Sequence, residues 1–409
     1  MLHTSGTGFK QFIKGFKWQG SSPTVKAKNI RINGSTVPVF EGEFWTAAQR
    51  QANAIHEVSY RACFKPQLPG FFINFFTVPG QLVLDPFNGR GTTAIQAALM
   101  GRNIAANDVN PLSLMLTRPR IEAPVLAIIE ERLNAIDFAR KKKAGIDLSM
   151  FYHPKTEAEL LALKQYLAER KNTKTEDAAD RWIRMVATNR LTGHSKGFFS
   201  VYTLPPNQAV SASRQVKINK ARALKPEYRD VKGLILRKSK GLLKNMDTET
   251  YTVLKKIKPK YMNGDAGKLA LNKNTVQLTV TSPPFLDVVQ YAADNWLRCW
   301  FNDIDVNEVA AKITMSKTVD EWGAKMGMVF KELYRVTAPG GAVAFEVGEV
   351  RGGKVKLDET VIPLGIEAGF ECLGVIINTQ SFTKTANIWG INNNRHGTNT
   401  NRIVVFRKD

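Results

Sequence analysis

The sequence is poor in the features that mark secreted and membrane proteins. Its 409 residues include only Cys63, Cys299 and Cys372, whose spacing fits neither a disulfide framework nor a zinc site. No apolar run approaches the ~20 residues of a membrane-spanning helix. The opening segment, MLHTSGTGFKQFIKGFKW, lacks the apolar centre of a signal peptide. We therefore expect a cytoplasmic protein without a membrane partner.

Acidic residues are also scarce, and histidines more so. There are 36 Asp and Glu against 58 Lys and Arg, a net charge of +22. This excess of positive charge favours a polyanionic partner. Nucleic acid is the better candidate, and a membrane surface is a much weaker one. None of the five histidines has a ligand-like neighbour pattern, so no metal is expected.

Basic residues concentrate between Arg181 and Asn245. This stretch holds fifteen Lys and Arg against two acids, over half of the net charge of the chain. Lys and Arg neutralise phosphates, which favours nucleic-acid contact for the segment as a whole. For any single residue, a solvated face of a helical insertion is the alternative. The contacts that we expect are Arg184, Arg190, His194, Lys196, Arg214, Lys217 and Lys220.

The segment Gln81–Pro111 predicts a βαβ unit. An apolar strand at Gln81–Leu84 is followed by the turn DPFNGRG, a helix over Thr93–Met100 and a strand at Ile104–Ala106. Ligands of such units bind at the carboxyl ends of the strands. Asp108, just after the second strand, suits ribose hydroxyls because they need an acceptor.

The glycine turn is not a phosphate loop. It lacks the Gly-Lys-Ser/Thr ending and the third glycine of the dinucleotide fingerprint. An acidic Asp85 before the turn would also repel phosphate. The turn instead suits a cationic ligand with an α-amino group or a sulfonium.

A second signal follows the expected strand Val276–Val280, where the chain reads TSPPF. Two prolines make a rigid corner whose carbonyls have no neighbouring N–H to bond. An exocyclic base amine is a poor nucleophile because its lone pair is delocalised into the ring. Acceptors at Ser282 and the Pro283 carbonyl would free that lone pair, and Phe285 offers a face for base stacking.

The two signals together resemble the amino-group DNA methyltransferases, whose motif I is DPFxGxGTT and whose motif IV is SPPY or SPPF. In that family, enzymes with serine at the first position of motif IV more often methylate N4 of cytosine, and enzymes with Asp or Asn there more often methylate N6 of adenine. The resemblance implies S-adenosylmethionine as cofactor and catalytic roles for Ser282, Pro283, Pro284 and Phe285. It implies cofactor contacts at Asp85, Pro86, Phe87, Gly89, Gly91, Thr92, Thr93, Asp108 and Asn110.

Two weaker segments extend the resemblance. HEVSYRACFKPQLPGFFINFF is similar to motif X, which implies that His56 and Tyr60 lie beside the methionine end of the cofactor. We expect these residues on one face of a helix over Phe44–Cys63, and a satisfied core histidine is the alternative for His56. YMNGDAGKLAL is similar to motif III, which implies that Asp265 meets the adenine amine.

The expected fold is a Rossmann-like α/β sheet of the S-adenosylmethionine-dependent methyltransferases with an inserted, mainly helical basic domain. We expect a mobile or loosely docked basic arm (1–40), a first catalytic part (41–120), a DNA-binding insertion (121–257) and a second catalytic part (258–409).

The expected activity is N4-cytosine methylation of double-stranded DNA, in restriction–modification or epigenetic marking. A cognate restriction endonuclease would be a partner, the enzyme would associate with the nucleoid, and the oligomeric state is open. The alternatives are N6-adenine or RNA methylation, or a non-catalytic nucleic-acid-binding protein on the same fold.

Overall fold

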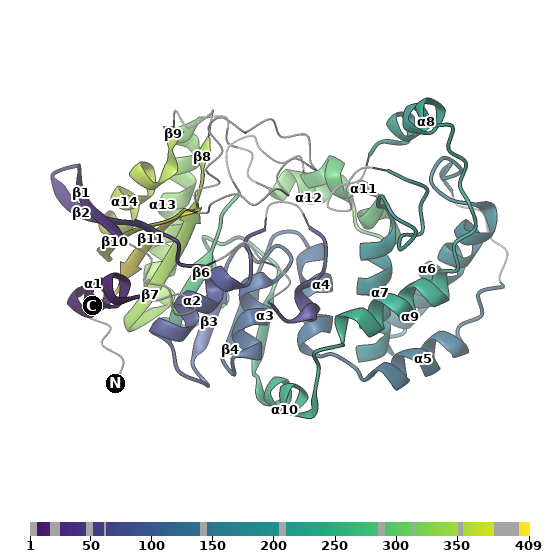
Figure 1. Ribbon diagram of the computed structural model, residues 1–409, viewed down its shortest axis with the longest axis horizontal. Coiled ribbons are helices and arrows are strands. Elements are labelled where there is room, and N and C mark those ends of the chain that lie inside the picture. The colour runs from purple at the N-terminus through teal and green to yellow at the C-terminus, as the bar shows by residue number, and fades with distance from the viewer. Residues whose placement is uncertain are drawn as a thin grey trace.

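The computed structural model describes residues 6–16, 25–45, 52–60, 63–139, 145–203, 210–284, 291–313, 316, 318–350, 355–379 and 401–409 (Figure 1). Within these ranges one nine-stranded sheet has the order β1-β2-β10-β11-β7-β6-β3-β4-β5. Its strands are β1 (Lys26–Ile32), β2 (Ser35–Gly42), β3 (Leu82–Asp85), β4 (Asn103–Asn107), β5 (Pro259–Met262), β6 (Val276–Thr281), β7 (Thr337–Val347), β10 (Glu371–Asn378) and β11 (Asn401–Arg407). A separate short pair consists of β8 (Glu349–Val350) and β9 (Val355–Lys356).

The central strands β5, β4, β3, β6 and β7 are parallel, and β11 is antiparallel to both of its neighbours. The chain moves outward from β3 to β4 and β5, and then returns to β6 on the other side of β3. This reversal is the switch point at which doubly wound sheets bind ligands. The expected Rossmann-like fold is confirmed.

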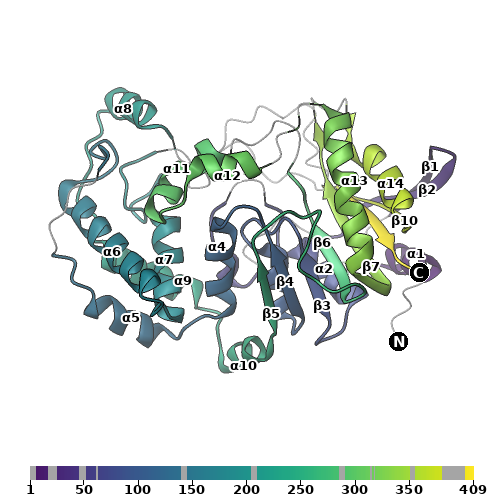
Figure 2. The ribbon, with the colours of Figure 1, turned by 180° about the vertical axis from the view of Figure 1, so that it is seen from behind.

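Helices cover both faces of the sheet. In Figure 1, α2 (Gln67–Phe76) and α3 (Thr92–Leu99) lie in front, and Figure 2 shows α13 (Val319–Val336) on the opposite face. Successive strand residues join opposite cores: Val83 packs with the α3 side and Leu84 with the α13 side. Burial on both faces explains why the central strands are continuous apolar runs. The α13 side is completed by α14 (Leu357–Glu367).

A helical lobe lies beside the sheet, beyond α4 (Leu112–Ile121) (Figures 1 and 2). It contains α5 (Leu126–Ala135), α6 (Pro154–Asn172), α7 (Ala178–Arg190), α8 (Ala212–Ala221) and α9 (Val231–Leu242), and α10 (Thr248–Lys256) leads back to β5. At the core of the lobe, the buried Trp182 of α7 donates to Ser239 Oγ of α9 at 2.9 Å.

Two further helices, α11 (Tyr291–Phe301) and α12 (Val306–Lys312), lie between the lobe and the sheet. Side chains of α11 bond to the lobe, since Trp296 Nε1 donates to the Val210 carbonyl at 2.9 Å. The chain segment that follows the proline corner is thus attached to the helical lobe. Within the described residues no helix has the length and hydropathy of a membrane span.

The segment 1–40 does not form the expected arm in the parts that the structure describes, residues 6–16 and 25–40. Within it, α1 (Gly6–Gly15) buries Phe9 and Ile13 completely, and β2 pairs in parallel with β10. Phe9 packs against Phe75 and Phe76 of α2, with ring centroids 5.7 Å apart in both pairs. The apolar face of α1 and the strand pairing therefore outweigh the basic, Gly/Ser-rich composition that suggested mobility.

The expected helix over Phe44–Cys63 is also wrong for the residues that the structure describes. They contain only a 3-10 turn, η2 (Ala54–His56), and residues 57–60 are not helical. Backbone groups here bond to distant side chains: the Ala54 N–H donates to Asn245 Oδ1 at 3.0 Å, and the Val58 carbonyl accepts from Arg90 at 3.1 Å. These tertiary hydrogen bonds replace those of a helix.

Candidate functional site

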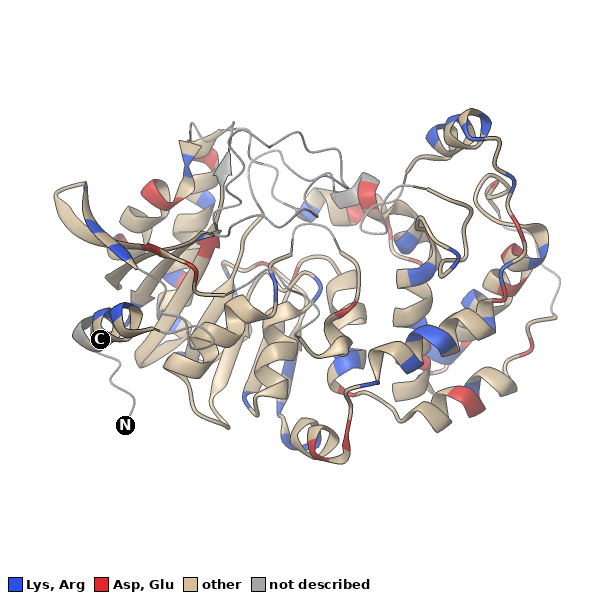
Figure 3. Ribbon diagram, in the orientation of Figure 1, with Lys and Arg blue, Asp and Glu red and all other residues tan. Residues whose placement is uncertain are grey.

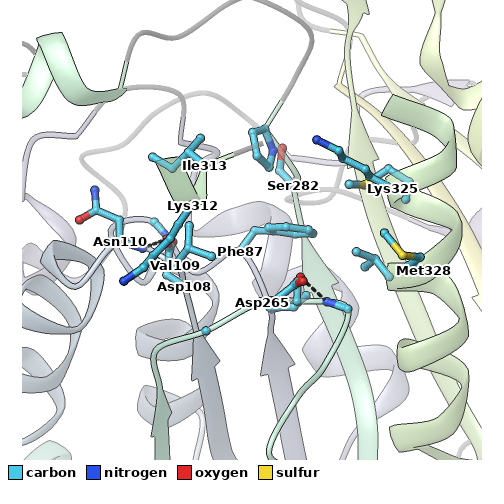
Figure 4. A pocket seen from close by; sticks show the side chains of 18 of the residues that line it. Phe87, Asp108, Val109, Asn110, Asp265, Ser282, Lys312, Ile313, Lys325 and Met328 are labelled. Carbon is cyan, nitrogen blue, oxygen red and sulfur yellow. Dashed lines mark hydrogen bonds between the residues drawn. The ribbon is translucent and has the colours of Figure 1, made fainter. Parts of the chain in front are cut away.

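A cavity of about 590 Å³ lies at the carboxyl ends of β3, β4, β5 and β6 (Figure 4). The strand ends form its floor, and residues at the end of α12 and along α13 form the opposite wall. From the floor it is lined by Pro86, Phe87, Gly89, Asp108, Val109, Asn110, Asn263, Gly264, Asp265, Ala266, Gly267, Ser282 and Pro284. The remaining lining residues are Tyr60, Lys312, Ile313, Trp322, Lys325, Met326, Met328 and Val329.

Asp108 is held at the cavity by backbone donors. Its Oδ2 accepts from the Gly89 N–H at 2.8 Å and its Oδ1 from the Asn110 N–H at 2.9 Å. Burial raises the pKa of Asp108 to about 6, against the opposing effect of these hydrogen bonds. Each carboxylate oxygen keeps a lone pair for a further donor, which a ribose hydroxyl can supply.

Asp85 lies behind the cavity wall and is 2% exposed. Its Oδ1 accepts from Thr281 Oγ1 at 2.6 Å and from the Phe87 N–H at 3.2 Å. Burial raises the pKa of Asp85 to about 7. Because Thr281 directly precedes Ser282, this carboxyl group joins the glycine turn to the proline corner. We expected Asp85 to contact a ligand directly, but the structure does not place this residue among those that line the cavity.

Amide side chains join the loops of the cavity floor. Asn107 Nδ2 donates to the carbonyls of Pro86, at 3.1 Å, and Gly264, at 2.9 Å. Asn263 Nδ2 donates to the Asp108 carbonyl at 2.6 Å. The loops after β3, β4 and β5 therefore form one cross-linked floor, which no reading of a single motif predicts.

The proline corner presents Ser282 and Pro284 to the cavity. Trp322 Nε1, on α13, donates to the Pro284 carbonyl at 2.9 Å and so fixes the corner. Pro283 is not among the lining residues, and Phe285 lies outside the described residues. Sequence reasoning missed Trp322, since its place on an amphipathic helix predicts burial and nothing more.

Gly91, Thr92 and Thr93 support the turn and do not line the cavity. Gly91 has φ +81°, and a Cβ at this position would clash with the Thr117 side chain. Thr93 Oγ1 donates to the Val280 carbonyl at 3.0 Å, and Thr92 Oγ1 accepts from the Arg90 side chain at 3.1 Å. Their expected part in cofactor binding can only be indirect.

Of the other predicted contacts, Tyr60, Asn110 and Asp265 line the cavity, whereas His56 does not. His56 is 1% exposed, and its Nε2 lies 3.1 Å from Gln96 Oε1. Burial lowers the pKa of His56 to about 3, helped by the charge of the nearby Arg120. His56 is thus a core histidine. Asp265 Oδ1 accepts from the Gly267 N–H at 2.8 Å, which orients the side chain in Figure 4.

The seven basic candidates divide into two groups. Arg184 is wrong as a nucleic-acid contact, because it is buried and bonds Glu176 at 2.7 Å and the Leu167 carbonyl at 2.8 Å. Arg190 is half-buried, with its guanidinium carbon 4.0 Å from the Phe198 ring centre. The exposed candidates lie on the loop after α7 and on α8, and the ribbon of α8 is largely coloured for Lys and Arg in Figure 3. They are His194, Lys196, Arg214, Lys217 and Lys220.

No group of three or more His, Cys, Asp or Glu among the described residues is placed to hold a metal ion. The fold and the cavity define a Rossmann-like α/β protein with a small-molecule site at its switch point.

Comparison with known proteins finds similarity to one class of enzymes. A family model described as DNA methylase matches residues 20–158. The Type II methyltransferase M.MjaII of Methanocaldococcus jannaschii is 29% identical over 99 residues, which are 24% of this chain and 16% of that protein. The chain therefore matches only a small part of this relative. Both findings are similarities to DNA methylases over part of the chain.

Solved structures with remote similarity include methyltransferases. A methyltransferase from Methanosarcina mazei described as SAM-dependent is 9% identical, with 82% of this chain and 96% of that chain covered and a TM-score of 0.33. A putative DNA modification methylase from Thermus thermophilus, in complex with S-adenosyl-L-methionine, is 22% identical over 36% of this chain and 53% of that chain, with a TM-score of 0.20. The fold assignment rests on the strand order of this chain itself.

Proposed function

We propose that this protein is an S-adenosylmethionine-dependent DNA methyltransferase that acts on an exocyclic base amine. The observation that carries the proposal is that one cavity contains both Asp108 of the cofactor-type turn and Ser282 of the proline corner. The bond from Thr281 to Asp85 holds the two motifs on adjacent strands, β6 and β3. A methyltransferase site has to bind the methyl donor and the acceptor amine next to each other, and this cavity has residues for both.

The residues present fit the cofactor. The cavity volume of about 590 Å³ lies in the range of small-molecule sites. Asp108 offers acceptors to ribose hydroxyls, and Asp265 offers one to an adenine amine. Val109, Ile313 and Phe87 supply apolar surface around these acceptors (Figure 4). When bound, S-adenosylmethionine supplies an electrophilic methyl group.

The corner supplies what the amine needs. Ser282 Oγ lines the cavity and can accept one amine hydrogen, and the carbonyl of the adjacent Pro283, which is not among the lining residues, is the expected acceptor for the other. Bonding both hydrogens shifts the nitrogen towards tetrahedral and frees its lone pair. The Pro284 carbonyl is occupied by Trp322, which keeps the corner rigid. Because Ser282 lines a cavity at the end of the sheet, a base has to leave the DNA stack to reach it.

The finer proposal is methylation at N4 of cytosine. Ser282 is neutral, so its oxygen can accept from the amine while its hydroxyl donates to N3 of the same base. An ionised aspartate at this position has no proton to donate. Adenine presents N1 beside its amine in a similar way, and this makes N6-adenine methylation the alternative outcome of the test.

Double-stranded DNA is the proposed substrate, and the helical lobe the proposed binding surface. The exposed residues Arg214, Lys217 and Lys220 lie on α8, and His194 and Lys196 lie on the loop after α7. Phosphate neutralisation by such side chains provides affinity without sequence selection. A cognate restriction endonuclease and association with the nucleoid remain predictions.

Mass spectrometry of nucleosides tests the proposal. The purified protein is incubated with S-adenosylmethionine and genomic DNA, and the digested DNA is searched for modified bases. We expect N4-methylcytosine with the wild-type chain and loss of most product with Ser282→Ala, at similar cofactor affinity. If N6-methyladenine is the only product, the target base is adenine and not cytosine. DNA binding without any methylated base would contradict the proposal that the protein is a methyltransferase.

A further inference from the structure

The backbone beside Tyr60 is held by a side chain of the helical lobe. Asn189, near the end of α7, donates from Nδ2 to the Ser59 carbonyl at 2.8 Å. Its Oδ1 accepts from the Ser59 N–H at 3.2 Å. One amide group thus satisfies both backbone groups of the residue before Tyr60, whose ring lines the cavity. The lobe therefore fixes part of the cavity wall from outside the sheet.

The same Asn189 oxygen has a second donor. Arg190 Nη2 donates to Asn189 Oδ1 at 3.1 Å, and the Arg190 guanidinium stacks on Phe198. The Phe199 N–H donates to the Arg190 carbonyl at 2.9 Å. Residues 191–198 therefore form a loop whose two ends meet at Arg190. This loop carries two of the exposed nucleic-acid candidates, His194 and Lys196.

A second contact reaches Tyr60 from α11. Arg298 Nη2 donates to the Ser59 carbonyl at 3.2 Å, and the Arg298 guanidinium carbon lies 5.8 Å from the Tyr60 ring centre. The Ser59 carbonyl therefore accepts from both Asn189 and Arg298. Both residues are buried, but Asn189 bonds Arg190, at which the ends of the loop meet, so Asn189 is the contact closest to the exposed loop. The hydrogen-bonded path from the loop to the cavity is short: Arg190, Asn189, Ser59 and then Tyr60.

We propose that Asn189 is a positioning residue that couples nucleic acid bound at the 191–198 loop to cofactor affinity in the cavity. A phosphate that engages the loop changes how the Arg190 guanidinium is shared between Phe198 and the Asn189 oxygen. That oxygen also receives the Ser59 N–H, so the change reaches the Tyr60 backbone. Such coupling is a free energy and acts equally in both directions. The proposal rests on the proposed function, because it needs both ligands.

Calorimetry of cofactor binding in the presence and absence of DNA tests the coupling. The ligands are S-adenosylmethionine and a random-sequence DNA duplex at low ionic strength. In the wild-type chain we expect the cofactor Kd to change by at least about fivefold when DNA is added. In Asn189→Ala we expect weaker cofactor binding and a Kd that is the same with and without DNA. Asn189→Asp keeps the size and the acceptor but loses the donor, and should lie between them.

The matched control is Asn302→Ala. Asn302 Nδ2 donates to Thr188 Oγ1 of α7 at 2.9 Å, so this variant also truncates a buried asparagine between α7 and the end of α11. The second bond of Asn302 Nδ2 is to the Arg298 carbonyl at 2.8 Å, and not to the Arg298 guanidinium that reaches Ser59. The coupling should therefore persist in this variant. A merely structural role for Asn189 predicts the same loss of stability in both variants and no special loss of coupling.

The outcomes separate the two proposals. A wild-type chain that fails to bind either ligand contradicts the proposed function. Binding of both ligands with an unchanged cofactor Kd overturns the coupling alone. Coupling that survives in Asn189→Ala, or disappears equally in Asn302→Ala, also removes Asn189 from its positioning role. If Asn189→Ala does not fold, the Asn189→Asp variant decides the question by the same comparison.

Discussion

Asp85 is a buried carboxylic acid, and burial favours its neutral form. Its pKa is raised from 3.8 to about 7, so between these pH values the folded chain retains a proton that the unfolded chain releases. The contribution of Asp85 to the free energy of unfolding should therefore fall as the pH rises from about 4 to about 7. The full shift corresponds to about 4 kcal/mol, so Asp85 contributes less to stability at pH 8 than at pH 5. His56, whose pKa is lowered to about 3, contributes with the opposite sign below about pH 6.5, so the effect of Asp85 is the difference between the wild-type chain and a variant without this carboxyl group.

Urea denaturation of the cofactor-free chain at several pH values measures this effect. Asp85→Asn cannot ionise, so most of the loss of stability towards pH 8 should disappear. Glu227→Gln replaces an exposed acid and should behave as wild type. An Asp85→Asn variant with the wild-type slope against pH would show that another group is responsible.

Asp108 is the residue whose loss should most weaken cofactor binding. In Asp108→Ala, the hydroxyl donors of the ligand and the N–H groups of Gly89 and Asn110 lose their acceptor. Unpaired polar groups of this kind weaken the binding free energy by about 1–3 kcal/mol. This is a loss of about five- to 150-fold in affinity, measurable by calorimetry. The exposed Asp303→Ala serves as control. Unchanged affinity in Asp108→Ala would place the cofactor elsewhere.

The affinity of the wild-type chain for the cofactor should also depend on pH, because the protonation state of Asp108 changes. Burial raises the pKa of Asp108 to about 6, so the carboxylate becomes protonated as the pH falls below that value. A protonated carboxyl group accepts less well and carries no charge to attract a cationic ligand. Calorimetric affinity should fall from pH 7 to pH 5, and a flat profile would contradict the role of Asp108.

At the scale of elements, α13 and the proline corner act together through one hydrogen bond. Trp322→Phe keeps the ring but removes the donor to the Pro284 carbonyl. We expect kcat to fall by about tenfold with little change in cofactor Kd, because the corner would hold the amine less rigidly. Trp296→Phe removes the indole bond to Val210 outside the cavity and is the matched control. Equal kcat values for the two variants would contradict the prediction.

The helix α8 offers a prediction about DNA. Replacing Arg214, Lys217 and Lys220 by Gln removes three exposed charges, which should weaken DNA binding and lower the slope of log K against log salt by up to ~3. Cofactor affinity should stay the same. The control replaces the exposed Lys255, Lys256 and Lys258 at and after α10, on the opposite side in Figure 1. DNA affinity that falls equally in both triple variants would mean that net charge alone matters.

At the scale of the whole molecule, the sheet and the lobe are joined through the cavity wall. Tyr60 lies on a segment that the lobe holds through Asn189, and α11 follows the proline corner while bonding to the lobe. DNA on the lobe would therefore lie next to two parts of the site at once.

The sequence by itself determined the βαβ unit, the proline corner and the class of fold, because these depend on local patterns of apolar, glycine and proline residues. It also identified Asp108 and Ser282 as residues that follow strands, and parallel strands bring such ends to one edge. For Asp265, a place in the site was implied by the resemblance to motif III. Local chemistry and the rules of sheet topology are sufficient for that much.

Only the tertiary structure decided which of these side chains face the cavity. Asp85 and Thr281 are 196 positions apart, and their hydrogen bond turns an expected ligand contact into a buried link between motifs. The segment around His56 and Tyr60 has helical spacing, yet Asn189 and Arg90 bond its backbone groups, and its described residues form a 3-10 turn but no α-helix. Such contacts join distant parts of the chain, and their geometry is fixed only when the sheet and the lobe have packed together.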